Sequence, residues 1–257
     1  AVENSQVLYT LIDESCFIGE TDGEGKLKEQ FPIGIGGVVN IVKEDYIGKA
    51  VEFDASIDEE KSLDAEINPI YTKKLVVKKK NIVKTLQGWV FNNEAIDLNE
   101  KEKAVVTLQR ISDGTELEFS SFAEYDGKSK DASLEIAPGT YSADITISLN
   151  ERIVIPEQER CENILGPLAK KCYTIPKIDL SEKSAPGDES FQEGGLKLNF
   201  TLDAQELASS NTLVLYVISV DLAAVPETQR VVEDLEELGK IEERSAANKN
   251  DLQPAFE

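Results

Sequence analysis

The sequence predicts a mainly β protein, built from tandem β-sandwich modules and ending in one C-terminal α-helix. Short runs rich in Val, Ile, Leu, Phe and Tyr recur along the chain, and turn-forming Gly, Pro, Asp and Asn separate them. Many of these runs alternate apolar with polar residues, as strands with one buried face do. The chain of 257 residues is long enough for two or three small modules with apolar cores.

Residues 1–80 are predicted to form the first module. Its strands are expected at residues 6–12, 16–19, 27–31, 38–43, 49–55 and 62–67. In the last two runs, apolar residues at every second position predict one buried and one solvated face. The basic run from Lys73 to Lys80 brackets three apolar residues, a pattern typical of an edge strand protected by charge.

The turns of this module follow a recurring pattern over about residues 7–69, at Thr21-Asp22-x-x-Gly25, Phe31-Pro32-x-Gly34, Val39-x-Ile41-x-Lys43-x-x-Tyr46 and residues 63–69. This pattern resembles the carboxypeptidase-regulatory-like family, a transthyretin-like, immunoglobulin-like β-sandwich related in architecture to Cna-B-type repeats of surface proteins. The resemblance implies that the tandem modules are immunoglobulin-like (transthyretin-like) β-sandwiches. A typical member begins with a further strand, for which only residues 1–5 remain here. The resemblance therefore implies an open sheet edge, to be covered by a later part of this chain or by a neighbouring molecule.

Residues 81–156 are predicted to form the second module, with strands at 85–91, 104–110, 116–122, 132–136 and 141–149. The last strand has the most regular alternation, and its inward residues are expected to be Tyr141, Ala143, Ile145, Ile147 and Leu149. The corner at residues 137–141 again resembles Cna-B-type repeats, so we interpret the second module as a repeat of the fold.

The remainder of the chain changes in character. Residues 157–195 contain two cysteines and several prolines and are predicted to be an insertion or linker. Residues 196–257 are expected to supply two strands that complete a sandwich, at 196–202 and 212–220, then a helix at 226–245 and a polar tail. Pro226 suits a first helical position, and apolar residues recur behind it at helical spacing.

The cysteines predict an oxidising compartment. Cys161 and Cys172 flank a loop of ten residues, and a disulfide between them would close it. Cys16 would then be left as a small buried side chain or an intermolecular thiol. The alternative is three reduced thiols in a cytosolic protein. Asn199 begins an Asn-Phe-Thr sequon and is expected to face outward, which makes it a glycosylation candidate.

Composition disfavours several functional classes. The net charge is −22 and no basic face is evident, so nucleic acid is not expected as a partner. The chain has no histidine, which removes the commonest general base and zinc ligand. We therefore expect no catalytic residues and no cofactor. Clustered acids at Asp13, Glu20, Asp22 and Glu24 are weak candidates for Ca²⁺ ligands, and a solvated loop is the alternative.

These observations favour a non-enzymatic extracellular or cell-surface protein with a structural or adhesive role. It would be a fibre or surface-layer subunit whose partner is protein, through self-association at sheet edges. The alternative function is a carbohydrate- or peptide-binding accessory module of a larger secreted protein. No apolar run is long enough for a membrane span in this segment.

Overall fold

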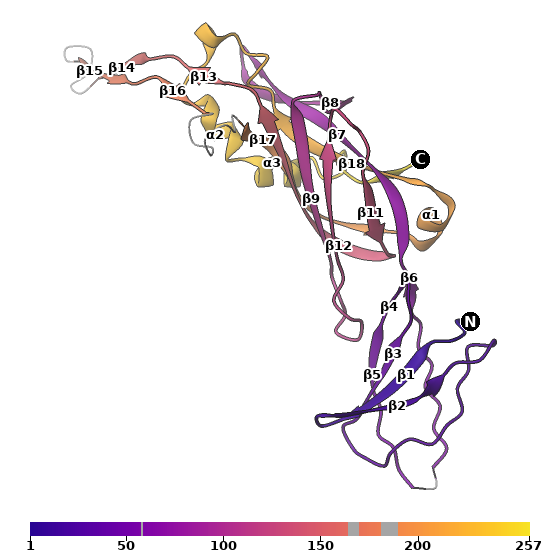
Figure 1. The fold of residues 1–257 in the computed structure, drawn as a ribbon. Helices are drawn as coiled ribbons and strands as arrows, with labels where there is room; N and C mark the ends of the chain where they lie inside the picture. The colour runs from indigo at the N-terminus through magenta and orange to yellow at the C-terminus, as the bar shows by residue number, and fades with distance from the viewer. Residues whose placement is uncertain (58, 164–169, 181–189) are drawn as a thin grey trace.

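The computed structural model describes residues 1–57, 59–163, 170–180 and 190–257. It confirms the mainly β class, with 52% of the residues in strands and 9% in helices. Two modules lie end to end, the N-terminal one at the bottom of Figure 1 and the larger one above it. The predicted tandem immunoglobulin-like arrangement is not confirmed, since the larger module is built on one long curled sheet.

The first module contains a four-stranded antiparallel sheet in the order β2-β1-β3-β5. Its strands are β1 (Gln6–Leu11), β2 (Glu14–Glu20), β3 (Val38–Val42) and β5 (Lys49–Glu52), and a short pair, β4 (Tyr46–Ile47) with β6 (Asn68–Pro69), leads into the second module. Val7, Tyr9 and Val39 form a small buried core on one face of the sheet.

Two segments predicted as strands are irregular in this module. Residues 27–31 and 62–67 belong to no strand, although Leu27, Phe31 and Leu63 pack against the core. The Phe31 ring, for example, meets Tyr9 edge-on with ring centroids 5.6 Å apart. Their apolar side chains are therefore partly buried against the core, but neither segment joins the sheet as a strand.

The second module is a nine-stranded sheet in the order β10-β9-β12-β17-β18-β7-β11, with β8 also paired to β7 and β19 to β18. The strands are β7 (Tyr71–Thr85), β8 (Gly88–Asp97), β9 (Glu102–Arg110), β10 (Ser120–Asp126), β11 (Ser133–Ile136), β12 (Gly139–Asn150), β17 (Ser190–Leu202), β18 (Thr212–Val220) and β19 (Ala255–Phe256). Two further pairs are β13 (Val154–Ile155) with β16 (Ile178–Asp179), and β14 (Gln158–Asn163) with β15 (Lys170–Ile175).

The large sheet curls so that its two ends meet. The Ser121 hydroxyl on β10 donates a hydrogen bond to the carbonyl of Glu135 on β11. The interior of the curl holds the main apolar core. The alternation predicted for residues 141–149 is confirmed, because every second side chain of β12, from Tyr141 to Leu149, is buried.

The basic run at residues 73–80 does not form a protected edge strand. It lies in β7, which is central in the sheet and pairs with β18 on one side and with β11 and β8 on the other. Lys73, Lys79 and Lys80 are buried. The predicted boundary between residues 80 and 81 therefore falls inside one 15-residue strand, in which Asn81 marks an irregularity in the pairing with β8 and not a turn.

The single C-terminal helix was also a wrong prediction. Residues 226–245 form a 3-10 turn η2 (Glu227–Gln229), then α2 (Asp234–Leu238) and α3 (Ile241–Ala247). Arg230 has an extended backbone at the end of η2, and α2 stops at Gly239. The helix α1 (Ala204–Ser209) was not predicted, although its start is capped by the Asp203 side chain, which accepts from two backbone N–H groups. None of the described helices has the length and apolarity needed to span a membrane.

A loop of the second module fixes the joint between the modules. Residues 115–117 pair with the edge of β5, through Ala50 N–H to Thr115 O (2.6 Å) and Leu117 N–H to Gly48 O (2.9 Å). Glu116 accepts from Arg110 and, at 2.8 Å, from Asn68 Nδ2, so that both modules hold it. The hydrogen bond from Arg110 lowers the Glu116 pKa. A later part of the chain thus covers one edge of the first sheet, while the outer edge of β2 pairs with no described strand.

Candidate functional site

A buried ionic cluster lies inside the curl of the second module. The Lys79 ammonium on β7 donates to the Glu102 carboxylate on β9, and it also lies 3.8 Å from Glu193 Oε1 on β17. The exposed fractions of the three side chains are 8%, 1% and 3%. β12, β17 and β18 separate β9 from β7 in the sheet, so this cluster joins opposite walls of the curl.

Local structure explains how each charged group reaches the interior. Lys79 follows Leu75 and Val77 at strand spacing and therefore points to the same face. Glu102 precedes Ala104 on the inward face of β9 in the same way. Glu193 is the unpaired residue of a β-bulge, since Gly194 faces Ile147 and Gln192 faces Ser148.

The bulge depends on a glycine. A Cβ atom on Gly194 would lie 2.1 Å from the carbonyl oxygen of Ile218, so no other residue fits without movement of the neighbouring strand. The close approach of β17 to β18 at this point encloses Glu193.

The cluster is only partly satisfied by hydrogen bonds. Glu102 also accepts from the backbone N–H and the side-chain amide of Asn99, at 2.8 and 2.6 Å. By contrast, Glu193 Oε1 and Ser219 Oγ are buried, and neither atom has a hydrogen-bond partner in the part of the chain that the structure describes. Burial raises the pKa of Glu193 to about 8, and the neighbouring Glu102 adds to the rise while Lys79 opposes it. The raised pKa favours the protonated form of Glu193 beside the ion pair of Lys79 and Glu102.

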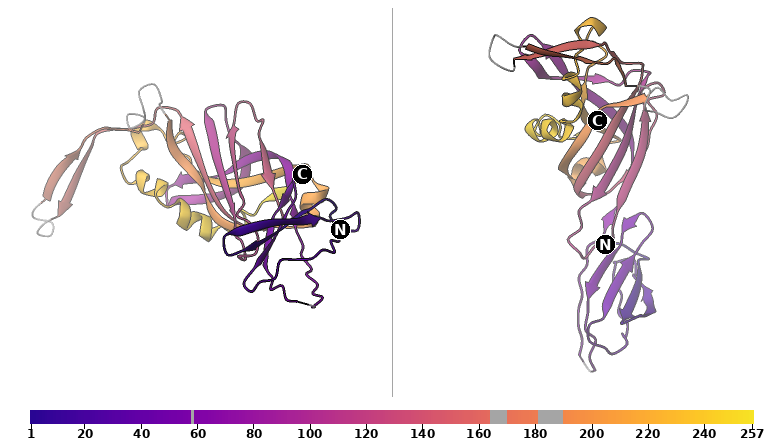
Figure 2. Two further views of the ribbon diagram at one scale, coloured as in Figure 1. Left: turned by 60° about the horizontal axis from the view of Figure 1, so that its bottom comes forward. Right: turned by 90° about the vertical axis from the view of Figure 1, so that its left-hand side faces the viewer.

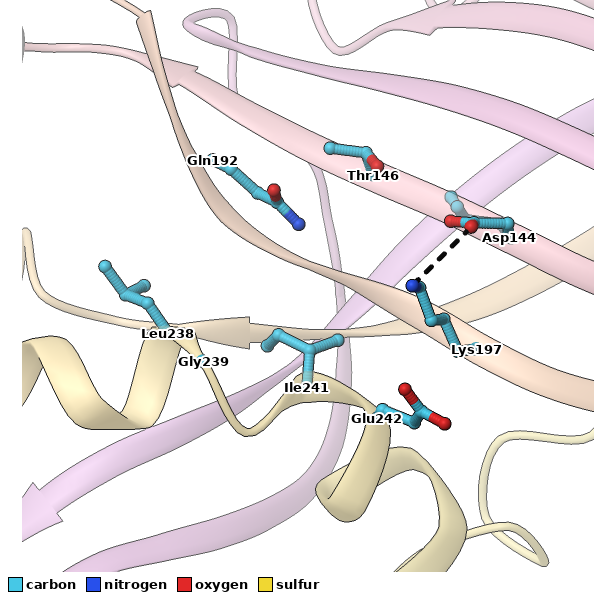
Figure 3. Close-up of a pocket in the computed structure, with 9 residues that line it drawn as sticks. Asp144, Thr146, Gln192, Lys197, Leu238, Gly239, Ile241 and Glu242 are labelled. Carbon is cyan, nitrogen blue, oxygen red and sulfur yellow. Dashed lines mark ion pairs between the residues drawn. The ribbon is translucent and has the colours of Figure 1, made fainter. Parts of the chain in front are cut away.

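A shallow groove of about 290 Å³ lies on the outside of the same sheet (Figure 3). Asp144 and Thr146 of β12 and Gln192 and Lys197 of β17 form one side of it. The turn between α2 and α3 forms the other side, with Leu238, Gly239, Ile241 and Glu242.

The groove offers mixed hydrogen-bonding groups beside an apolar wall. Lys197 Nζ lies 3.9 Å from Asp144 Oδ2, a loose contact between two exposed side chains. Such a pair costs little to separate when another polar group enters. The groove could therefore hold a hydroxyl-rich or peptide-like ligand by hydrogen bonds from both strands.

The predicted disulfide is present. Cys161 and Cys172 face each other across the β14–β15 pair and are bonded. Asn199 lies on the outward face of β17 and is exposed, as its alternation predicted. Glycosylation at this residue stays a prediction. Cys16 is a free and exposed thiol on β2, so the expectation of a small buried side chain is wrong.

The four weak Ca²⁺ candidates lie in the first module without forming a group. In the described residues, the only cluster of three or more potential Cys, His, Asp or Glu ligands is Glu159 with Cys161 and Cys172, and both of its sulfurs belong to the disulfide. Asp22 caps its own turn, where it accepts from the N–H groups of Glu24 and Lys26 (2.9 Å each). Cation binding by Asp13, Glu20, Asp22 and Glu24 stays a prediction.

The buried cluster was not predicted, although the positions of two of its members indicate it. Lys79 and Glu102 each occupy the inward phase of an alternating strand, a position where a charge must be paired. The sequence pattern does not indicate that Glu193 faces inward, because its orientation depends on the bulge.

Comparison of the chain with protein-family models, with curated proteins and with solved structures finds no match.

Proposed function

We propose that this chain is a non-enzymatic structural protein of the cell surface or extracellular space, which assembles with copies of itself through sheet edges. The resemblance of the first module to surface-protein repeats is part of the same proposal. The observation that carries it is the joint between the modules. Strand pairing at residues 115–117 and the shared Glu116 hold the two modules end to end, as a spacer requires.

Other features agree with this role. The disulfide between Cys161 and Cys172 favours an oxidising compartment. The outer edge of β2, with which no described strand pairs, is suited to strand addition from another molecule. The net charge of −22 opposes random aggregation and leaves association to specific contacts.

Sedimentation velocity over a hundredfold range of protein concentration tests the proposal. We expect the weight-average sedimentation coefficient to rise with concentration, because the sheet-edge contact is reversible. A strictly monomeric chain at the highest concentration would contradict self-assembly.

The groove in Figure 3 favours a second candidate function, the binding of a carbohydrate or peptide as an accessory module. A ligand would replace the loose contact between Asp144 and Lys197 and bridge β12 to the turn between α2 and α3. We expect a bound oligosaccharide or peptide to raise the melting temperature of the chain by a few degrees through linkage.

A thermal-shift screen with a glycan set and a short-peptide set tests this second function. Any hit should disappear in Lys197→Ala and persist in Lys128→Ala, since Lys128 is exposed and outside the groove. A screen without hits would contradict the binding function and leave self-assembly untouched.

A further inference from the structure

The β14–β15 pair forms an arm that projects from the second module. The arm lies at the end of the molecule opposite the first module in two of the views (Figures 1 and 2). Gln158 Nε2 donates to Arg230 O at 3.1 Å, and Arg160 forms an ion pair with Glu233. Beyond these contacts near its base, the described side chains of the arm are exposed.

The arm adds little to the core but is stiffened by a covalent bond. An isolated two-stranded hairpin is marginally stable in water, and the disulfide between directly opposed residues 161 and 172 compensates for this. A rigid, solvated hairpin of this kind is suited to contacts with another molecule.

The charge of the arm differs in sign from that of the first module. β15 contains two lysines and no acidic residue, and both Lys170 and Lys171 are exposed. Residues 1–69 contain sixteen acidic residues and five lysines. Opposite ends of one molecule are therefore electrostatically complementary, which favours contacts between the arm of one copy and the first module of another.

The outer edge of β2 is the matching surface in the first module. β2 pairs only with β1 among the described strands, whereas the edge of β5 is covered by residues 115–117. Phe17 is 61% exposed on β2, and Glu20 ends the strand. An incoming strand would complete the backbone hydrogen bonds of this edge and cover the Phe17 ring.

We propose that β15 of one molecule adds antiparallel to the β2 edge of the next copy, a contact that rests on the proposed self-assembly. One register forms both an opposite-charge pair and an aromatic pair, because it places Lys170 opposite Glu20 and Tyr173 opposite Phe17. Opposite charges and aromatic pairs directly across two strands both stabilise such a pairing. Because donor and acceptor surfaces differ, the contact repeats head to tail and produces open chains.

The free thiol of Cys16 makes the register directly testable. In the proposed pairing, Thr174 of one copy lies opposite Cys16 of the next. Under mild oxidation, Thr174→Cys should therefore give a ladder of covalent dimers, trimers and longer chains on a non-reducing gel. The same substitution in a Cys16→Ser background should give no species beyond a dimer, and Lys171→Cys, which faces Gly19, should crosslink at least fivefold less.

Charge reversal provides a second measurement that does not depend on thiols. Lys170→Glu and Glu20→Lys should each weaken association roughly 10-fold, and a mixture of the two should regain it. Lys128→Glu and Glu124→Lys are controls with the same charge changes on exposed residues elsewhere. If wild-type protein assembles but the ladder and the charge effects are absent, the arm contact is wrong and self-assembly stands. If wild-type protein remains monomeric, both fail.

Discussion

Replacement of Lys79 by methionine is expected to destabilise the second module by roughly 3–5 kcal/mol. Methionine fills a similar volume, so the loss comes mainly from the Glu102 carboxylate, which is 1% exposed and loses its cation. Urea denaturation at pH 7 measures the change in the free energy of unfolding.

Two further variants show whether this loss is electrostatic. Lys101→Met removes the exposed pair with Glu151 and should cost less than about 1 kcal/mol. Lys79→Met combined with Glu102→Met should recover most of the stability, because it leaves no unpaired charge at this contact. If Lys79→Met alone costs no more than Lys101→Met, the cluster does not hold the walls of the curl together.

Replacement of Glu193 by glutamine should stabilise the protein at alkaline pH and remove part of its pH dependence. The folded state raises the pKa of Glu193 from 4.5 to about 8, mainly through burial. Between these values the folded state keeps a proton that the unfolded state releases, so stability falls as pH rises, by up to about 1.4 kcal/mol per pH unit. Above the folded pKa the penalty is complete and constant.

Glutamine does not titrate, so the variant should escape this penalty. The difference in unfolding free energy between Glu193→Gln and wild type should be small near pH 4.5, grow toward pH 8 and then level off. Denaturation curves at five pH values measure it, and Glu124→Gln, an exposed change on β10, should differ from wild type by less than about 0.5 kcal/mol throughout. A difference that is the same at all five pH values would contradict the buried protonated carboxyl group.

Local patterns predicted the strands of this protein better than their arrangement. The alternation in residues 141–149 specified β12 and its buried face, since a slip of one residue would expose five apolar side chains. The apolar run at 212–220 likewise indicated β18, which lies between β17 and β7. Alternation does not specify which strands pair. The position of β18 between β17 and β7, and the curl of the sheet, were therefore not predicted.

The remaining differences have specific physical causes. The lysines of β7 indicated an edge because exposed lysines protect edges. In the structure Lys79 is neutralised by Glu102, and the buried Lys80 ammonium donates hydrogen bonds to Asn93 Oδ1 and to the carbonyl of Asp251. Segment 27–31 has the composition of a strand, yet it buries Phe31 across the face of the sheet. The disulfide was predictable because Cys161 and Cys172 flank a short loop, whereas the direction of the arm depends on contacts at its base.

Negative-stain electron microscopy of the concentrated protein tests end-to-end self-assembly. We expect chains of elongated particles in which the arm end of one molecule meets the first module of the next, and we expect these chains to shorten in Lys170→Glu. Fields of single particles alone, at concentrations far above those used for sedimentation, would contradict it.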